Sequence, residues 1–157
     1  MLTAAILTIS DSAKAGTRTD LSGPLLQDTL AKAGFEVVAM EVAADDMTEI
    51  QNAIVQLAIQ ARFVVTTGGT GVAPRDVTPE ATRNVCDKLI PGYAELIRAS
   101  GLKRTPYAAL SRAVAGTRGT TLIMNTPGSP KGAVDSLQAV LHLVPHTLDL
   151  LMGKTEH

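Results

Sequence analysis

The chain of 157 residues has no tryptophan, two tyrosines, two phenylalanines and a single cysteine. Because Cys86 has no second thiol to pair with, no internal disulfide is expected, and this pattern is typical of a reducing compartment. So few aromatic side chains leave little surface on which nucleic-acid bases could stack. Lys and Arg (14) are balanced by Asp and Glu (15), so the basic excess of a nucleic-acid binder is absent. We expect no nucleic-acid partner.

Long apolar runs are also absent, since none reaches the roughly 18 residues that a membrane span needs. The N-terminus lacks the basic segment and cleavage site of a signal peptide. These two absences predict a cytoplasmic protein without a membrane partner. A chain of this length is typical of one domain, here residues 1–157, and it can bury about two thirds of its unfolded surface without a disulfide or metal.

Strand and helix patterns alternate along the chain, which predicts an α/β layer architecture. Short apolar runs predict strands at Ala4–Ser10, Phe35–Ala43, Phe63–Thr67 and Thr121–Asn125, with Ala113–Arg118 as a further candidate. Apolar periodicity and capping residues predict helices from Ser22 to Gly34, Thr48–Arg62, from Thr78, Pro91–Ser100 and Ala133–Val144, with a last helix that Pro145 starts or kinks. Ser22 and Thr78 are the predicted caps of their helices.

Polar or glycine-rich segments follow four of the predicted strands. In an open α/β sheet, ligands lie beyond the carboxyl ends of the strands, so segments far apart in sequence meet at one edge. We therefore expect the functional site to be built from Ser10–Ser12, Asp45-Asp46, Gly68–Asp76 and Asn125–Gly132.

Gly68-Gly69-Thr70-Gly71 has the composition of an anion-binding nest, because glycines allow successive N–H groups to point at a phosphate. It is neither a P-loop nor a GxGxxG motif. The segment is equally compatible with a tight turn that binds nothing. A second loop with Gly128 and Ser129 is, by itself, more typical of a simple strand-to-helix turn.

Asp45 and Asp76 are candidate ligands of a cation beside the glycine loop. A carboxylate next to a phosphate repels it unless a cation lies between them, and Mg²⁺ fills this role with one or two protein carboxylates. The alternatives are structural: Asp45 or Asp46 could cap a helix, and Asp76 could pair with Arg75 or close a turn.

The run from Thr67 to Thr82 (TGGTGVAPRDVTPEAT) resembles the signature of the molybdopterin adenylyltransferases, a family that includes the G domains of plant and animal molybdenum-cofactor proteins such as gephyrin. The resemblance extends over nearly the whole chain. Its other matching segments are Ile9–Ser12 with Asp20 and Ser22–Pro24, Leu102–Pro106, Leu110–Arg112, Ala115–Gly119 and Asn125–Pro130.

The resemblance implies a three-layer α/β/α homotrimer with a mostly parallel sheet. It implies that Mg²⁺ and ATP are used to adenylylate molybdopterin, with a possible hand-over of the product to a molybdenum-insertion protein. Carried onto this chain, the catalytic and tentative Mg²⁺-binding residues are Asp45 and Asp76, and the nucleotide and phosphate ligands are Gly68, Gly69, Thr70, Gly71, Gly128 and Ser129. Ser10, Asp11, Ser111 and Arg112 are expected to bind the substrate on the pterin side.

Three other functions use the same residues differently. A non-catalytic molybdopterin-binding or scaffold protein would keep the glycine loops but would not need Asp45 and Asp76. A nucleotide hydrolase or another nucleotidyltransferase would turn over ATP without molybdopterin. A purely structural trimer would need no ligand. The presence of both carboxylates favours catalysis.

Overall fold

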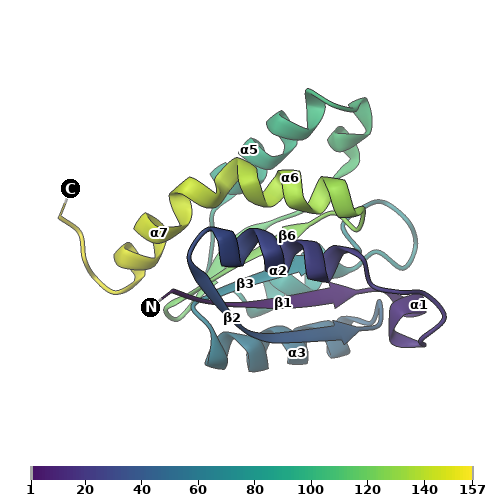
Figure 1. The fold of residues 1–157 in the computed structure, drawn as a ribbon, viewed down its shortest axis with the longest axis horizontal. Helices are drawn as coiled ribbons and strands as arrows, with labels where there is room; N and C mark the ends of the chain where they lie inside the picture. The colour runs from purple at the N-terminus through teal and green to yellow at the C-terminus, as the bar shows by residue number, and fades with distance from the viewer. Residues whose placement is uncertain (1, 157) are drawn as a thin grey trace.

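A six-stranded sheet forms the centre of the molecule in the computed structural model, which describes residues 2–156 (Figure 1). The strands are β1 (Leu2–Ile9), β2 (Phe35–Ala43), β3 (Phe63–Thr67), β4 (Lys88–Leu89), β5 (Ala115–Arg118) and β6 (Thr121–Thr126), in the spatial order β2-β1-β3-β6-β5-β4. β2, β1, β3 and β6 run parallel, whereas β5 and β4 are antiparallel to their neighbours. The predicted mostly parallel sheet is confirmed.

Helices cover both faces of the sheet. One face packs against α2 (Ser22–Lys32), α5 (Pro91–Leu102), α6 (Pro130–Val140) and α7 (Val144–Leu151), and the other against α3 (Met47–Gln60) and α4 (Thr78–Val85). Alternate residues of β1 show why its sequence is continuously apolar, since Ile6 packs into the first layer and Leu7 into the second. The three-layer α/β/α architecture is confirmed.

The order of the strands positions the site. The chain passes from β1 to β2 on one side and then to β3 on the other, so the strand order reverses at β1. Such a switch point opens a crevice outside the carboxyl ends of the strands. Figure 1 shows the arrowheads of β1 and β2 at the same end of the sheet as the short helix α1 (Asp11–Lys14).

Three predicted helix starts differ from the structure. Ser22 is the first residue of α2 and caps nothing; Asp20 Oδ1 instead accepts the N–H of Gly23 at 3.0 Å. At α4 the cap position is Val77, so the prediction that Thr78 caps this helix is wrong. α6 begins at Pro130 rather than Ala133, because Ser129 Oγ accepts the N–H of Gly132 and caps the helix.

The elements that the sequence did not predict are short. They are α1, β4 and the 3₁₀ turns at Pro106–Leu110 (η1) and Leu141–Leu143 (η2). None is long enough to show a period of 2 or 3.6 residues. Cys86 lies just after α4, and burial raises the pKa of its thiol to about 11. Pro145 is the second residue of α7 and so lies at its start, where a proline is tolerated. No helix within residues 2–156 is long and apolar enough to cross a bilayer.

Candidate active site

Two cavities meet at the carboxyl edge of the sheet. One, called here the β1 cavity, has a volume of about 500 Å³ and lies between the segments that follow β1, β2, β3 and β6. The other, the α5 cavity, has a volume of about 420 Å³ and lies between α5, η1 and α6. The residues that line both cavities are Gly69, Asp76, Gly128 and Ser129. Four residues predicted for the site therefore lie where the two cavities join.

The glycine loop (Gly68–Gly71) has a backbone that requires glycine at its first two positions. Gly68 and Gly69 have φ values of +105° and +68°, which L side chains rarely adopt. A Cβ on Gly68 would clash with the carbonyl oxygen of Ile9, and one on Gly69 would clash with Thr78 Oγ1. The loop thus packs tightly against β1 and α4.

Two residues, Thr78 and Arg112, donate hydrogen bonds to the four successive carbonyl groups of the glycine loop. Thr78 donates its side-chain O–H to the first carbonyl (2.9 Å) and its backbone N–H to the second (3.1 Å). Arg112 donates its backbone N–H to the third (2.8 Å) and its Nε–H to the fourth (2.7 Å). All four carbonyl groups of the loop are therefore held on the protein side.

The N–H groups of the glycine loop have the opposite orientation. In a trans peptide the carbonyl and the next N–H point in opposite directions, and the described chain contains no cis bond. Within residues 2–156, no protein acceptor is bonded to the N–H groups of residues 69–72. A row of N–H groups without protein acceptors is the chemistry of an anion-binding nest.

The second loop (Pro127–Pro130) repeats this arrangement with neutral donors. Thr67 Oγ1 donates to the carbonyl of Pro127, and Ser22 Oγ donates to that of Gly128, both at 2.8 Å. The loop leads into the N-terminus of α6, where the helix dipole favours an anion. A Cβ on Gly128 would lie 3.4 Å from the Cα of Gly68, so the two loops lie side by side.

Asp45 and Asp46 have different roles although they are adjacent. Asp46 Oδ2 accepts the N–H of Glu49 at 2.9 Å and caps α3. Asp45 lines the β1 cavity, and its Oδ2 accepts the N–H of Asp11 at 3.1 Å. Burial raises the pKa of Asp45, and the nearby negative charges of Asp11 and Asp76 raise it further. Of the two alternatives, the capping role belongs to Asp46.

Asp76 also closes a turn, because its Oδ2 accepts the N–H of Ala73 at 3.0 Å. A Cβ on Gly69 would lie 3.1 Å from Asp45 Oδ1, and one on Gly71 would lie 3.0 Å from Asp76 Oδ2, so both carboxylates lie against the glycine loop. In the described part of the chain, Oδ1 of Asp45 and Oδ1 of Asp76 accept no hydrogen bond. Two available carboxylate oxygens fit Mg²⁺, which takes its other ligands from water and phosphates.

No denser metal site is present among the described residues, where no group of three His, Cys, Asp or Glu side chains is placed to hold an ion. A structural zinc site needs four such ligands. A cation held by Asp45 and Asp76 would therefore need further ligands from water or from a bound phosphate.

The four residues predicted for the pterin side are not brought together. Ser10 lines the β1 cavity and caps α1, whereas Ser111 lines the α5 cavity. Asp11 is engaged by Arg75, whose Nε and Nη2 both donate to its carboxylate and lower its pKa. Arg112 lines neither the β1 cavity nor the α5 cavity, and its guanidinium donates to the carbonyl groups of Gly71 and Asp76. Both Asp11 and Arg112 therefore hold loops in place in this structure.

Several residues of the site were given no binding or catalytic role from the sequence. Asp20 lines the β1 cavity and accepts hydrogen bonds from Thr8 Oγ1 (2.7 Å) and from the N–H of Gly23 (3.0 Å). Arg98 and Arg104 line the α5 cavity. Asp20 sits two residues before a Ser-Gly-Pro helix start, which is a usable signal, but nothing local distinguishes the two arginines from other surface arginines.

Known proteins of similar sequence identify the family of this chain. Residues 5–146 match the family described as "Probable molybdopterin binding domain". The chain is 42% identical over 152 residues to the molybdopterin adenylyltransferase of Helicobacter pylori (strain J99), covering 94% of this chain and 86% of the relative. It is 39% identical to the molybdenum cofactor synthesis protein cinnamon of Drosophila melanogaster, covering 96% of this chain and 26% of that longer protein.

Solved structures agree with the sequence relatives. The crystal structure of the molybdopterin biosynthesis enzyme MoaB from Thermus thermophilus is similar with a TM-score of 0.92 and 49% identity, covering 98% of each chain. The match thus extends over nearly the whole of both chains. The chain belongs to the probable molybdopterin binding domain family.

Proposed function

We propose that this protein transfers AMP from ATP to the terminal phosphate of molybdopterin and releases pyrophosphate. The observation that carries the proposal is the row of N–H groups at residues 69–72, flanked by Asp45 and Asp76 where two cavities join. The relatives named molybdopterin adenylyltransferase support the choice of substrates. A transfer between two substrates needs two adjoining binding spaces and a shared site for the reacting phosphates.

The two cavities differ in charge, and we base the assignment of the substrates on this difference. The β1 cavity contains Asp20, Asp45 and Asp76 with one arginine, Arg18, and we assign to it the nucleotide with its cation. The α5 cavity contains Arg98 and Arg104 with the shared Asp76 and apolar groups, and we assign to it the pterin with its phosphate. Ser111 remains on the pterin side, and Ser10 moves to the nucleotide side. The residues shared by both cavities then contact the phosphates.

The proposed reaction needs no general base. A phosphate monoester has a second pKa near 6 and is largely dianionic at neutral pH, so the nucleophile is already ionised. The pterin phosphate oxygen attacks the α-phosphorus of ATP, and the bond to the bridging oxygen of pyrophosphate breaks. Both loops donate N–H groups to phosphate oxygens and so stabilise the charge that develops in the transition state.

Mg²⁺ fits the two carboxylates at this site. Asp45 and Asp76 would hold it through their unbonded Oδ1 atoms, and when bound it would neutralise phosphate charge.

Three further parts of the proposal come from the family resemblance. They are a homotrimeric assembly, a cytoplasmic location and hand-over of the product to a molybdenum-insertion protein. Light scattering on the purified protein at several concentrations tests the first, and a mass of one or two chains would contradict it.

The reaction is tested by incubating purified protein with molybdopterin, ATP and Mg²⁺ and measuring pyrophosphate and the AMP–pterin adduct. Product that depends on all three components supports adenylyl transfer. Tight pterin binding without an adduct would instead favour a carrier or scaffold. ATP cleavage without pterin would favour a hydrolase.

A further inference from the structure

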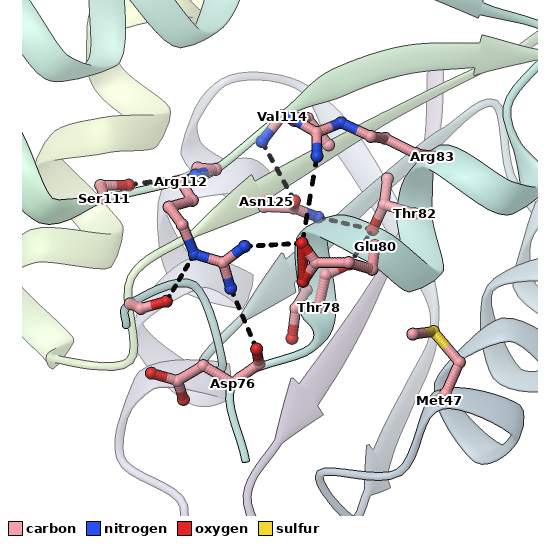
Figure 2. A network of polar contacts seen from close by, with 12 residues as sticks. Met47, Asp76, Thr78, Glu80, Thr82, Arg83, Ser111, Arg112, Val114 and Asn125 are labelled. Carbon is pink, nitrogen blue, oxygen red and sulfur yellow. Dashed lines mark hydrogen bonds and ion pairs between the residues drawn. The ribbon is translucent and has the colours of Figure 1, made fainter. Parts of the chain in front are cut away.

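Arg112 donates three hydrogen bonds to carbonyl groups of the segment from Thr70 to Asp76. Its Nε donates to the carbonyl of Gly71 at 2.7 Å, and its Nη2 donates to the carbonyl of Asp76 at 2.9 Å. Its backbone N–H donates to the carbonyl of Thr70 at 2.8 Å. Figure 2 shows the guanidinium of Arg112 reaching Glu80 and the backbone carbonyl of Asp76, whose carboxylate takes no part in these contacts.

The guanidinium is itself held by Glu80, in the first turn of α4. Arg112 Nη1 lies 2.6 Å from Glu80 Oε2, and this hydrogen bond lowers the pKa of Glu80. The planar fork of an arginine keeps its donors at fixed angles. One side chain therefore fixes the beginning and the end of the segment from Gly71 to Asp76 relative to α4.

Arg112 lies on the side of the loop away from the phosphates. Because its partners are carbonyl oxygens, the N–H groups that follow Thr70, Gly71 and Asp76 must point away from it. Three of the five N–H donors of the guanidinium are used in these contacts with Gly71, Asp76 and Glu80. The three nitrogens of the side chain each have a partner within the protein.

We infer that Arg112, anchored by Glu80, is a positioning residue that orients the glycine-loop N–H groups and Asp76 for phosphate binding. It touches neither the nucleotide nor the pterin. This inference rests on the proposed function for its role in turnover, but its structural part concerns phosphate binding alone. The two parts are therefore tested separately.

The first test measures phosphate binding by calorimetry, with Mg²⁺-pyrophosphate titrated into the free protein. Arg112→Lys keeps the positive charge but reaches only one of the acceptors that the fork bonds. We expect its affinity for pyrophosphate to fall roughly 10-fold or more, which is the usual cost of losing hydrogen bonds to a charged group. The melting temperature controls for folding.

Arg83→Ala is the matched control. Arg83 Nη1 lies 3.9 Å from the same Glu80 oxygen, but Arg83 bonds no atom of the loop. The substitution removes one positive charge close to the same carboxylate, and we expect pyrophosphate affinity to change less than about 2-fold. An equal loss in both variants would overturn the inference, because removal of an arginine that contacts only Glu80 would then matter as much as loss of the hydrogen bonds to the loop.

The second test separates kcat from KM in the adenylyl-transfer assay. If Arg112 positions the loop, Arg112→Lys lowers kcat roughly 10- to 100-fold and changes the KM for molybdopterin little. A raised KM for molybdopterin with unchanged pyrophosphate affinity would make Arg112 a substrate contact and overturn the inference. Unchanged values throughout would also overturn it.

Glu80→Gln provides a variant that keeps Arg112 and every loop contact. It removes the charge of the anchor but retains an oxygen acceptor, so we expect a loss of about 3-fold in the same direction as Arg112→Lys. This variant decides the question if Arg112→Lys unfolds; no loss in it would then count against the inference. Failure of wild-type protein to form the adduct would instead contradict the proposed function, while the pyrophosphate comparison still tests Arg112.

Discussion

The carbonyl groups of the glycine loop and of the second loop both accept hydrogen bonds from side chains outside the loop, but the donors differ in chemistry. Thr78 and the charged Arg112 hold the glycine loop, whereas the neutral hydroxyls of Thr67 and Ser22 hold the second loop. Asp76 follows the glycine loop and lies against it, while the second loop has no acidic residue and leads directly into α6. The first loop therefore supplies carboxylate chemistry and precise geometry, and the second supplies the field of a helix N-terminus. Substitutions at the glycine loop should therefore reduce turnover and phosphate binding more than substitutions at the second loop.

The largest effect is expected from Asp76→Asn in the glycine-loop segment. The amide oxygen can still accept the N–H of Ala73, so the turn and the melting temperature are retained. Loss of the negative charge removes a cation ligand, and we expect turnover to fall roughly 100-fold or more. Adduct formation measured under saturating substrates checks this, and turnover near the wild-type value would remove Asp76 from the catalytic residues.

A tenfold smaller effect is expected from Thr78→Val, which keeps the shape of the side chain. The fully buried Thr78 loses its O–H, and the carbonyl of Gly68 loses its partner at a cost of about 1–3 kcal/mol in the free energy of unfolding. We expect roughly 10-fold weaker binding of pyrophosphate. Thr78→Ser, which keeps the hydroxyl, is the control; equal losses in both variants would show that the methyl group, not the hydrogen bond, matters.

A smaller effect is expected from Ser22→Ala beside the second loop. The carbonyl of Gly128 loses one neutral hydrogen bond, worth about 1 kcal/mol, so pyrophosphate affinity should fall about 3- to 5-fold. Thr29→Ala removes a hydroxyl from the same helix that bonds only the carbonyl of Leu25, and it should leave affinity unchanged. If Ser22→Ala costs more than Thr78→Val, the proposed inequality between the loops is wrong.

The smallest effect concerns the stability of the free protein and comes from Asp45→Asn. Because the pKa of Asp45 is raised above its ordinary value of 3.8, the ionised carboxylate is less favoured in the folded than in the unfolded state. At neutral pH the variant should therefore melt slightly higher than the wild type. The difference should close as pH falls from the raised pKa toward the ordinary value of 3.8, below which the wild-type carboxyl is protonated in both states.

Calorimetric melting curves between neutral pH and about pH 4 check this sign. Added Mg²⁺ serves as the control, because it should stabilise the wild type and have little effect on the variant. A variant that melts lower than the wild type at neutral pH would contradict the direction of the shift.

Much of the fold follows from local patterns. The apolar runs and periodicities predicted the principal strands and helices, and the position of four segments after four strands predicted one edge for the site. Gly68 and Gly69 are a clear case, since adjacent glycines after a buried strand indicate unusual backbone angles, and both have positive φ.

The contacts that orient the loops could not be predicted in this way. Arg112 reaches Gly71 from 41 positions further along the chain, and Ser22 reaches Gly128 across 106 positions. Both contacts depend on the strand order and on how the helices pack, which local sequence does not encode. For the same reason Arg112 and Asp11 were expected at the substrate, although their charged groups bond neighbouring loops.

The central claim is that this protein moves the adenylyl group of ATP onto molybdopterin. The most direct measurement follows radiolabel from ATP into the pterin product, with the label placed on the α-phosphorus in one reaction and on the γ-phosphorus in a parallel one. The account predicts that the α-label enters the pterin product and the γ-label is released as pyrophosphate. Entry of the γ-label into the pterin, or release of either label without any pterin product, would contradict it.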